Sequence, residues 1–313
     1  VVVVSQLPPA VTKTMLGRTG ELNSSLTNKL VSLAQKYESA EFLLKDPSQF
    51  MHRYESVREA ETVAFLAANL AFGRREQILS HVELILDAAG KSPVSWILSK
   101  KYDNFFPENE HSFYRMYTNR DMRLFFDGLR AILEESETIG EFFKEKWEEG
   151  QNVNVKETTD YTDEKKWRLT CRTDRTGRMH DKDKGTMSFP HSDTGIFLHQ
   201  IIASAFPSEC KLLPHSKDSA AKKVNMLLRW LVRTNSPVDL GLWTWFNKKD
   251  LLMPLDTHVM RQANEQGLIH SKSANLRTAI ELTKKVAEIF PDDPVKADFA
   301  LFGLGVTLQN KER

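Results

Sequence analysis

Two lysines and one aspartate in the second half of the chain have the chemistry that covalent catalysis needs. Lys222 and Lys223 are adjacent in "SAAKKVNMLLRWLVR", and Asp256 opens "DTHVMRQANEQGL". A lysine amine whose pKa is lowered by burial or by neighbouring cations acts as a nucleophile. A carboxylate held nearby stabilises positive charge that develops on the reacting atom. We therefore expect one of these amines and the carboxylate to face a common cleft.

The helix expected to carry the two lysines covers residues 219–234. Its apolar residues recur at about 100° per residue, which predicts that one face docks on a core. Lys222, Arg229 and Arg233 project from the opposite, polar face. Lys223 lies near the boundary, where its stem can be buried while its amine reaches a cleft. The docking face consists of Ala220, Val224, Leu227, Leu228 and Leu231.

A second helix, residues 257–266, is expected to begin directly after Asp256. Pro254 prevents the helix from starting earlier, and Gly267 is suited to end it. The Asp256 side chain is suited to cap the first backbone amides. Capping alone would explain an aspartate at this position, and capping is compatible with a role in catalysis.

Helical periodicity dominates the remaining sequence and predicts an all-α fold of about ten helices. The segment 59–72, "EAETVAFLAANLAF", is apolar on most of its circumference, which is typical of a buried central helix. Gly90 and Pro93 mark a helix stop and a first helical turn. The other predicted helices are residues 23–37, 74–88, 93–100, 110–119, 121–135, 194–205, 275–290 and 294–303.

The composition divides the chain into two helical lobes with an active cleft between them. We expect an N-terminal lobe over residues 21–147 and a C-terminal lobe over residues 191–313. Residues 1–20 are expected to be a flexible extension. Residues 148–190 are expected to be a mobile polar insertion, with a local hairpin around "DRTGR", because apolar residues are too sparse there to bury a face.

Composition also limits the class of protein. No apolar run approaches the ~18 to 20 residues that span a bilayer, so we expect a cytoplasmic protein, and we expect it to be a monomer. Cys171 and Cys210 are the two cysteines of the chain, too few for a disulfide framework or a four-cysteine site. We assign no metal and no cofactor. Residues 211–270 hold nine Lys or Arg against five acids, which permits phosphate contacts without requiring them.

The segment "PLDTHVMR" resembles the part of the helix-hairpin-helix DNA glycosylase superfamily that carries the catalytic aspartate. In that superfamily a hairpin between two helices delivers a lysine nucleophile early in the second helix, often with an asparagine three residues later. The resemblance assigns the nucleophile to Lys222, with Asn225 at the expected offset, and the carboxylate to Asp256. Lys223 remains the alternative nucleophile.

Most of residues 40–306, apart from the polar insertion, also resembles an uncharacterised bacterial family, the domain of unknown function 2400. The segments that carry this resemblance include "VAFLAANLAFGRREQI" and "DPVKADFALFGLGV". Two features depart from the glycosylases: residues 213–220 lack the hairpin glycines, and 34 residues separate Lys222 from Asp256. The long separation is similar to that in the archaeal 8-oxoguanine glycosylase branch.

The resemblance implies a two-lobed DNA base-excision repair glycosylase, with or without AP lyase activity. Its substrate would be double-stranded DNA that contains an oxidised purine such as 8-oxoguanine. Trp243 and Trp245 could stack on an extruded base, although tryptophans are more often core residues. The other DNA contacts expected from the resemblance are Arg74, Arg75, Gln77, Lys223, Asn225, Arg229 and His258.

Two other classes of function stay open at this point. One is a nucleic-acid-binding protein that has this fold without catalysis, and the other is a helical scaffold for protein interaction. Arg74, Arg75 and Gln77 could equally form a solvated turn, and His258 a structural hydrogen bond. Asp298 is expected to pair with a backbone amide or a lysine, and we assign it no catalytic role.

Overall fold

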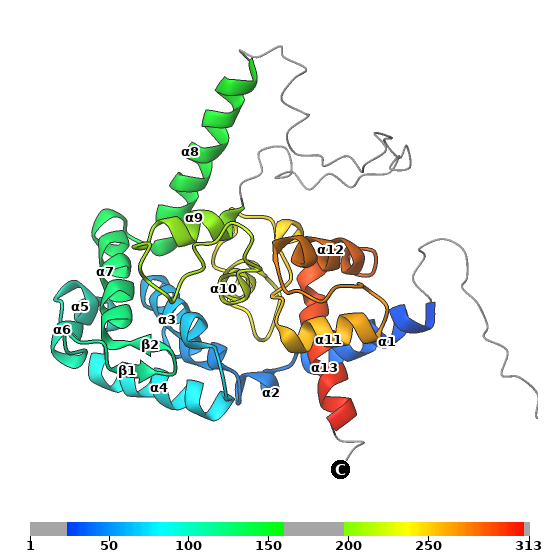
Figure 1. Ribbon diagram of the computed structural model, residues 1–313, viewed down its shortest axis with the longest axis horizontal. Coiled ribbons are helices and arrows are strands. Elements are labelled where there is room, and N and C mark those ends of the chain that lie inside the picture. The colour runs from blue at the N-terminus through cyan, green and yellow to red at the C-terminus, as the bar shows by residue number, and fades with distance from the viewer. Residues whose placement is uncertain (1–23, 160–196, 310–313) are drawn as a thin grey trace, which may run out of the picture.

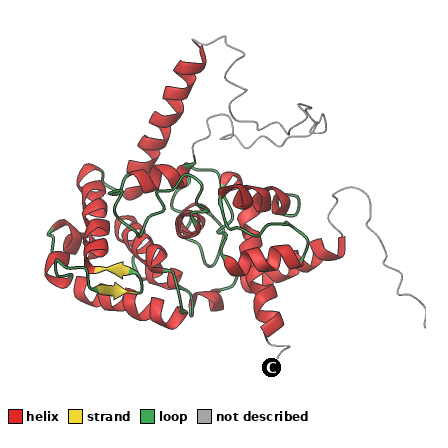
Figure 2. Cartoon of the chain, in the orientation of Figure 1, coloured by secondary structure: helices red, strands yellow, loops and turns green. Residues whose placement is uncertain are grey.

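The computed structural model describes residues 24–159 and 197–309, and this part of the chain is all-α (Figures 1 and 2). It contains thirteen α-helices, three short 3-10 helices and one two-stranded sheet in the described residues. The predicted extension, residues 1–20, and the hairpin expected around "DRTGR" lie outside the described residues.

The first half of the described chain forms eight α-helices, one 3-10 helix and the sheet, among residues 24–159. In order they are α1 (Ser24–Tyr37), α2 (Ala40–Leu43), η1 (Pro47–Arg53), α3 (Val57–Leu70), α4 (Arg75–Ala89), α5 (Pro93–Leu98), α6 (Tyr102–Phe105), β1 (Ser112–Tyr114), β2 (Tyr117–Thr118), α7 (Asn119–Glu135) and α8 (Ile139–Thr159).

The second half carries the two helices of the candidate site, among residues 197–309. In order its elements are α9 (Leu198–Ser204), α10 (Lys222–Val232), η3 (Lys248–Asp250), α11 (Thr257–Glu265), α12 (Leu276–Ala287), η4 (Pro294–Lys296) and α13 (Ala297–Gln309). The helix ends expected at Gly90 and Gly267 are confirmed. Each glycine follows the last residues of a helix and itself has a positive φ.

The central position predicted for the helix in "EAETVAFLAANLAF" is confirmed. Residues 60–70 of α3 are all buried, and α3 packs against η1, α4, α5 and α8. It also packs against α10 from the second half of the chain, and both helices lie in the middle of the molecule (Figure 1). The lysine helix α10 is therefore fixed to the N-terminal part of the core.

A continuous apolar core includes buried residues from both predicted lobes. The first and last helices also meet, because α1 packs along α13, as the blue and red ribbons of Figure 1 show. The N-terminal helix thus supports the C-terminal half of the protein, although the sequence assigned it to the other lobe. A long-range contact of this kind has no signal in local periodicity.

The prediction of a helix over residues 110–119 is wrong. These residues form the antiparallel hairpin of β1 and β2, whose tip is Arg115 and Met116. The hairpin is held by tertiary contacts, since the Tyr114 hydroxyl donates to the carbonyl of Phe72 at 2.6 Å. Arg115 has a positive φ of 54° at the turn. The sequence of this turn lacks the glycine or asparagine that usually indicates such a conformation.

The boundary predicted at residue 147 also differs from the structure. Helix α8 continues to Thr159, into the segment expected to be an irregular polar insertion. Figure 1 shows its C-terminal end projecting away from the other helices. None of the described helices combines the length and apolar character that crossing a bilayer requires.

Candidate functional site

The lysine helix starts from a strained turn. Ala221, which precedes α10, is buried and has left-handed backbone angles of φ 45° and ψ 40°. The Ser219 hydroxyl accepts the Ala221 amide at 3.1 Å, and the Asn225 side-chain amide donates to the carbonyl of Ala220 at 2.9 Å. Asn225 is itself buried and stabilises this turn, so the DNA contact expected of it is wrong for this structure.

Lys222 and Lys223, adjacent in sequence, have very different surroundings. The Lys223 amine donates to the carbonyls of Asn69 at 3.1 Å and Leu212 at 2.5 Å, and to the Tyr117 hydroxyl at 2.8 Å. Burial lowers the pKa of Lys223 to about 7. The Lys222 amine is half-buried and makes a weak contact of 3.7 Å with the sulfur of Met226. Of the two amines, that of Lys222 has the weaker contacts with the described residues.

The predicted capping role of Asp256 is confirmed. Its Oδ1 accepts the backbone amides of His258 at 2.9 Å and Val259 at 2.8 Å, at the first turn of α11. Its Oδ2 accepts no hydrogen bond from another residue that the structure describes, which leaves one carboxylate oxygen for a ligand. The His258 side chain is exposed.

Asp298, on α13, brings the two candidate residues into one electrostatic neighbourhood. Burial raises the pKa of its carboxyl, and the Arg229 guanidinium opposes that effect. The Asp256 carboxylate raises the same pKa and the Lys222 ammonium lowers it, so both charges act on Asp298. Residues that are 34 positions apart in the sequence are thus grouped around one carboxyl group.

Arg229 is the partner of Asp298, and the expected pairing with a backbone amide or a lysine is wrong. Arg229 is 3 % exposed, also pairs with Asp239 at 3.2 Å, and lies over the Phe299 ring. A solvent-facing DNA contact by Arg229 is therefore excluded in this structure. The sequence offers a signal for Asp298 alone: it is the one charged residue in the sequence of α13, and a charge buried in an apolar helix must be paired.

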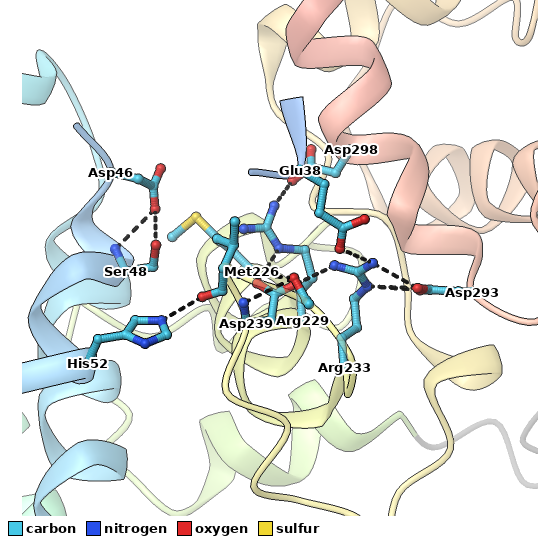
Figure 3. Close-up of polar contacts among 12 residues, drawn as sticks. Glu38, Asp46, Ser48, His52, Met226, Arg229, Arg233, Asp239, Asp293 and Asp298 are labelled. Carbon is cyan, nitrogen blue, oxygen red and sulfur yellow. Dashed lines mark hydrogen bonds and ion pairs between the residues drawn. The ribbon is translucent and has the colours of Figure 1, made fainter. Parts of the chain in front are cut away.

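Arg233 extends the same buried network, which Figure 3 shows between α10 and the C-terminal helices. It is 1 % exposed, although the sequence predicted that it projects from a polar face. Its guanidinium pairs with Asp239, with Asp293 at 2.8 Å and with Glu38 at 2.8 Å. The network joins α10 to α1 and to the segment before α13, and so fixes the helix that carries Lys222.

Trp243 is a core residue, and its expected role in base stacking is wrong. It is 1 % exposed, it packs against Phe65 and Phe143, and its indole donates to Glu61 at 2.8 Å. The half-buried Trp245 stacks on Trp243 with ring centroids 5.5 Å apart. The Trp245 indole nitrogen is buried and has no hydrogen-bond partner among the described residues.

Arg74, Arg75 and Gln77 lie at the start of α4, and Arg74 and Gln77 are exposed. The Arg75 guanidinium lies over the ring of Phe302 at 5.5 Å. Phe302 is four residues after Asp298 on α13, so both side chains lie on one face of that helix. The turn between α3 and α4 is therefore close to the helix that carries Asp298.

Two apolar side chains are exposed beside this turn. Phe72 is 41 % exposed and Met116, at the tip of the β1–β2 hairpin, is 57 % exposed. The Arg115 guanidinium lies over the Phe72 ring at 4.9 Å. A Cβ at Gly73, which has a φ of +117°, would come within 2.9 Å of Arg115 and Tyr114. The hairpin tip and the α3–α4 turn thus form a close-packed exposed corner.

No group of three or more His, Cys, Asp or Glu in the described ranges is arranged to hold a metal ion. A small apolar cavity lies among α3, α4, α5 and α7, and neither Lys222 nor Asp256 lines it. Cys210 is buried, and burial raises the pKa of its thiol to about 11, which makes it a poor nucleophile.

Comparison with known proteins identifies a family. The family model described as "Protein of unknown function (DUF2400)" matches residues 46–307. No curated protein and no solved structure matches the chain. The match covers most of the chain, including α10, α11 and Asp298, and the chain therefore belongs to the DUF2400 family.

Proposed function

We propose that this protein is a DNA base-excision glycosylase in which Lys222 is the nucleophile and Asp256 the stabilising carboxylate. The main observations behind this proposal are the weak contact of the Lys222 amine at the start of α10 and the unused carboxylate oxygen of Asp256 before α11. Both charges also act on the Asp298 carboxyl of α13. In this proposal the Lys222 amine and the Asp256 carboxylate act on the same reacting sugar. The substrate class, an oxidised purine such as 8-oxoguanine in double-stranded DNA, comes from the resemblance of the "PLDTHVMR" segment alone.

The chemistry uses the two groups in different ways. As the bond between the base and the anomeric carbon breaks, the base leaves with the electron pair and the sugar gains positive charge. The Asp256 carboxylate stabilises that charge electrostatically. Lys222 gives up a proton to the departing base, the resulting amine attacks the anomeric carbon, and opening of the sugar ring gives an imine with Lys222. β-Elimination from that imine would break the strand and provide the lyase activity.

Lys222 is preferred to Lys223 on hydrogen bonding. The Lys223 amine already has three acceptors, which come from α3, β2 and the segment before α10. Moving it to a substrate would break all three hydrogen bonds. Lys222 would exchange only a contact with the Met226 sulfur. In this proposal Lys223 anchors the start of α10 and Lys222 reacts.

Base extrusion requires a group that fills the gap left in the duplex. With Trp243 in the core, we assign this role to the exposed corner of Phe72 and Met116. Arg74 and Arg115 flank these apolar side chains and can contact phosphates on either side of the gap. We propose that DNA lies across the junction of the two halves of the protein, as in a two-lobed glycosylase.

The test is a panel of duplexes, each with one lesion, assayed for strand release after alkaline treatment. The wild type should release strand from at least one oxidised purine. Lys222→Gln and Asp256→Asn should lower the rate by a factor of roughly 100 or more, since each removes a group used in the transition state. Lys101→Gln, an exposed lysine of the first half, is the control and should keep the wild-type rate.

The other two classes of function give different results in the same assay. A binding protein without catalysis would bind duplexes with an affinity that depends strongly on salt. Asp256→Asn would not change that affinity, and no strand would be released. A scaffold would do neither. Absence of strand release on every lesion, with a correctly folded wild type, would contradict the glycosylase proposal.

A further inference from the structure

Two surface loops that adjoin the candidate residues meet in the structure. The first, residues 213–221, leads into α10 and Lys222, and the second, residues 266–275, leads out of the helix capped by Asp256. They are joined by an antiparallel bridge between Ser219 and Asn275 and by the Leu276 amide, which donates to the Asp218 carbonyl at 2.9 Å. The two loops thus form one surface.

Exposed cations gather on this surface. Lys217 on the first loop and Lys272 and Arg277 at the second are all exposed, and none forms an ion pair with another residue that the structure describes. Asp218 is the one carboxylate between Lys211 and Lys222, and residues 266–280 contain none. We call Lys217, Lys272 and Arg277 the two-loop cationic surface.

The second loop holds Lys272 on a hydrogen-bonded backbone. The Asn264 side chain bonds both the amide and the carbonyl of Ser271, each at 3.0 Å, and the Thr278 hydroxyl donates to the Ser273 carbonyl at 2.8 Å. These bonds fix the chain on either side of Lys272. A cation on a fixed loop loses less conformational entropy when it binds an anion than one on a flexible loop.

We infer that the two-loop cationic surface binds the phosphate backbone of double-stranded DNA beside the candidate site. Exposed cations that form no ion pair with a described residue match a regular row of phosphates, and binding releases the counterions of the duplex. The inference depends on the DNA-binding part of the proposed function and is independent of catalysis. Lys272 and Arg277 are the central residues of this surface.

The experiment compares two double variants that remove the same charge. Binding of a fluorescent, undamaged duplex is followed by anisotropy between ~50 and ~200 mM salt. Lys272→Gln with Arg277→Gln should weaken binding roughly five- to tenfold per lost phosphate contact, and should lower the slope of log K against log salt by roughly 0.9 per contact. Lys91→Gln with Lys101→Gln, exposed lysines of the first half, should leave affinity and slope unchanged.

Several results would overturn the inference. The Lys272→Gln, Arg277→Gln variant could keep the affinity and salt slope of the wild type. Alternatively, the Lys91→Gln, Lys101→Gln control could lose as much affinity as that variant. The wild type could also fail to bind the duplex while it binds inorganic phosphate or polyglutamate. Borohydride trapping on lesion DNA separates this inference from the enzymatic proposal: salt-dependent binding that needs Lys272 and Arg277, without a trapped adduct, supports the surface and contradicts the glycosylase.

Discussion

The backbone of Ala221, directly before the candidate nucleophile Lys222, is strained. Its left-handed conformation costs an L-residue about 1 to 2 kcal/mol, and the turn is kept by the hydrogen bonds of Ser219 and Asn225. The gain is a fixed direction for the first residue of α10. Strain that is held by surrounding contacts beside a reactive group is a common feature of functional sites.

Substitutions at Ala221 test this strain. Ala221→Gly should change the free energy of unfolding by less than about 1 kcal/mol, because relief of strain offsets the added freedom of the unfolded chain. Ala221→Val should cost about 2 kcal/mol or more, since a β-branched residue is poorly tolerated at positive φ in a buried turn. Urea denaturation of both variants is the measurement, and equal stabilities would contradict the strained turn.

The adjacent lysines provide a matched pair for stability. Lys223→Met should cost about 2 to 4 kcal/mol, because it leaves two carbonyls and the Tyr117 hydroxyl without their donor. Lys222→Met should change stability by less than about 0.5 kcal/mol. Denaturation with urea near neutral pH compares the two variants. A larger loss in Lys222→Met than in Lys223→Met would reverse the roles that we assign to these lysines.

At the scale of elements, Glu61 connects three parts of the fold. It lies on α3, accepts the Trp243 indole, and accepts the Gly140 amide at 3.1 Å at the start of α8. Burial raises the pKa of this carboxyl to about 7. Between pH 4.5 and 7 the folded protein therefore keeps a proton that the unfolded chain has lost, and the contribution of Glu61 to stability falls as pH rises.

The prediction compares wild type with Glu61→Gln from pH 5 to pH 8. The wild type should lose up to roughly 3 kcal/mol over this range relative to the variant. The comparison with the variant is needed because His199, whose pKa burial lowers to about 4, changes stability in the opposite direction. Urea denaturation at each pH gives the difference, and a difference that does not vary with pH would contradict the prediction.

Several helices could be predicted from the sequence, either from an apolar face at helical spacing or from a long run without Gly or Pro. Residues 57–70 and 222–232 follow this rule, and the cap at Asp256 follows from a proline and a carboxylate at a helix start. The segment 110–119 could not be predicted, because its hairpin depends on a bond from Tyr114 to the Phe72 carbonyl. Local sequence does not contain information on a partner that is 42 positions away.

The candidate site was predictable in part for the same reason. Lys222 and Asp256 could be proposed from the sequence because an amine and a carboxylate have the required chemistry. The burial of Arg229 and Arg233 could not, because it depends on carboxylates from other elements. A helical wheel places these arginines on a polar face, and it has no means to show that α1 and α13 cover that face. The same limit applies to Trp243, which lies in a loop without periodicity.

At the scale of the whole molecule, the buried ion network joins the C-terminal part of α10 to residues beside α1 and at the start of α13. Arg233→Met should cost about 3 to 5 kcal/mol, because it leaves the carboxylates of Asp239, Asp293 and Glu38 without this partner. Arg120→Met, which breaks an exposed pair with Glu110, should cost less than about 1 kcal/mol. Thermal or urea denaturation distinguishes them, and similar small losses would contradict a stabilising network.

The central claim is that Lys222 reacts with DNA while Asp256 faces the same sugar. The most direct measurement is borohydride trapping on a duplex with one oxidised purine, followed by digestion and mass spectrometry of the DNA-linked peptide. We expect the adduct on Lys222, its loss in Lys222→Gln, and its strong reduction in Asp256→Asn. An adduct on Lys223 or elsewhere, or none with any lesion tested, would contradict the claim.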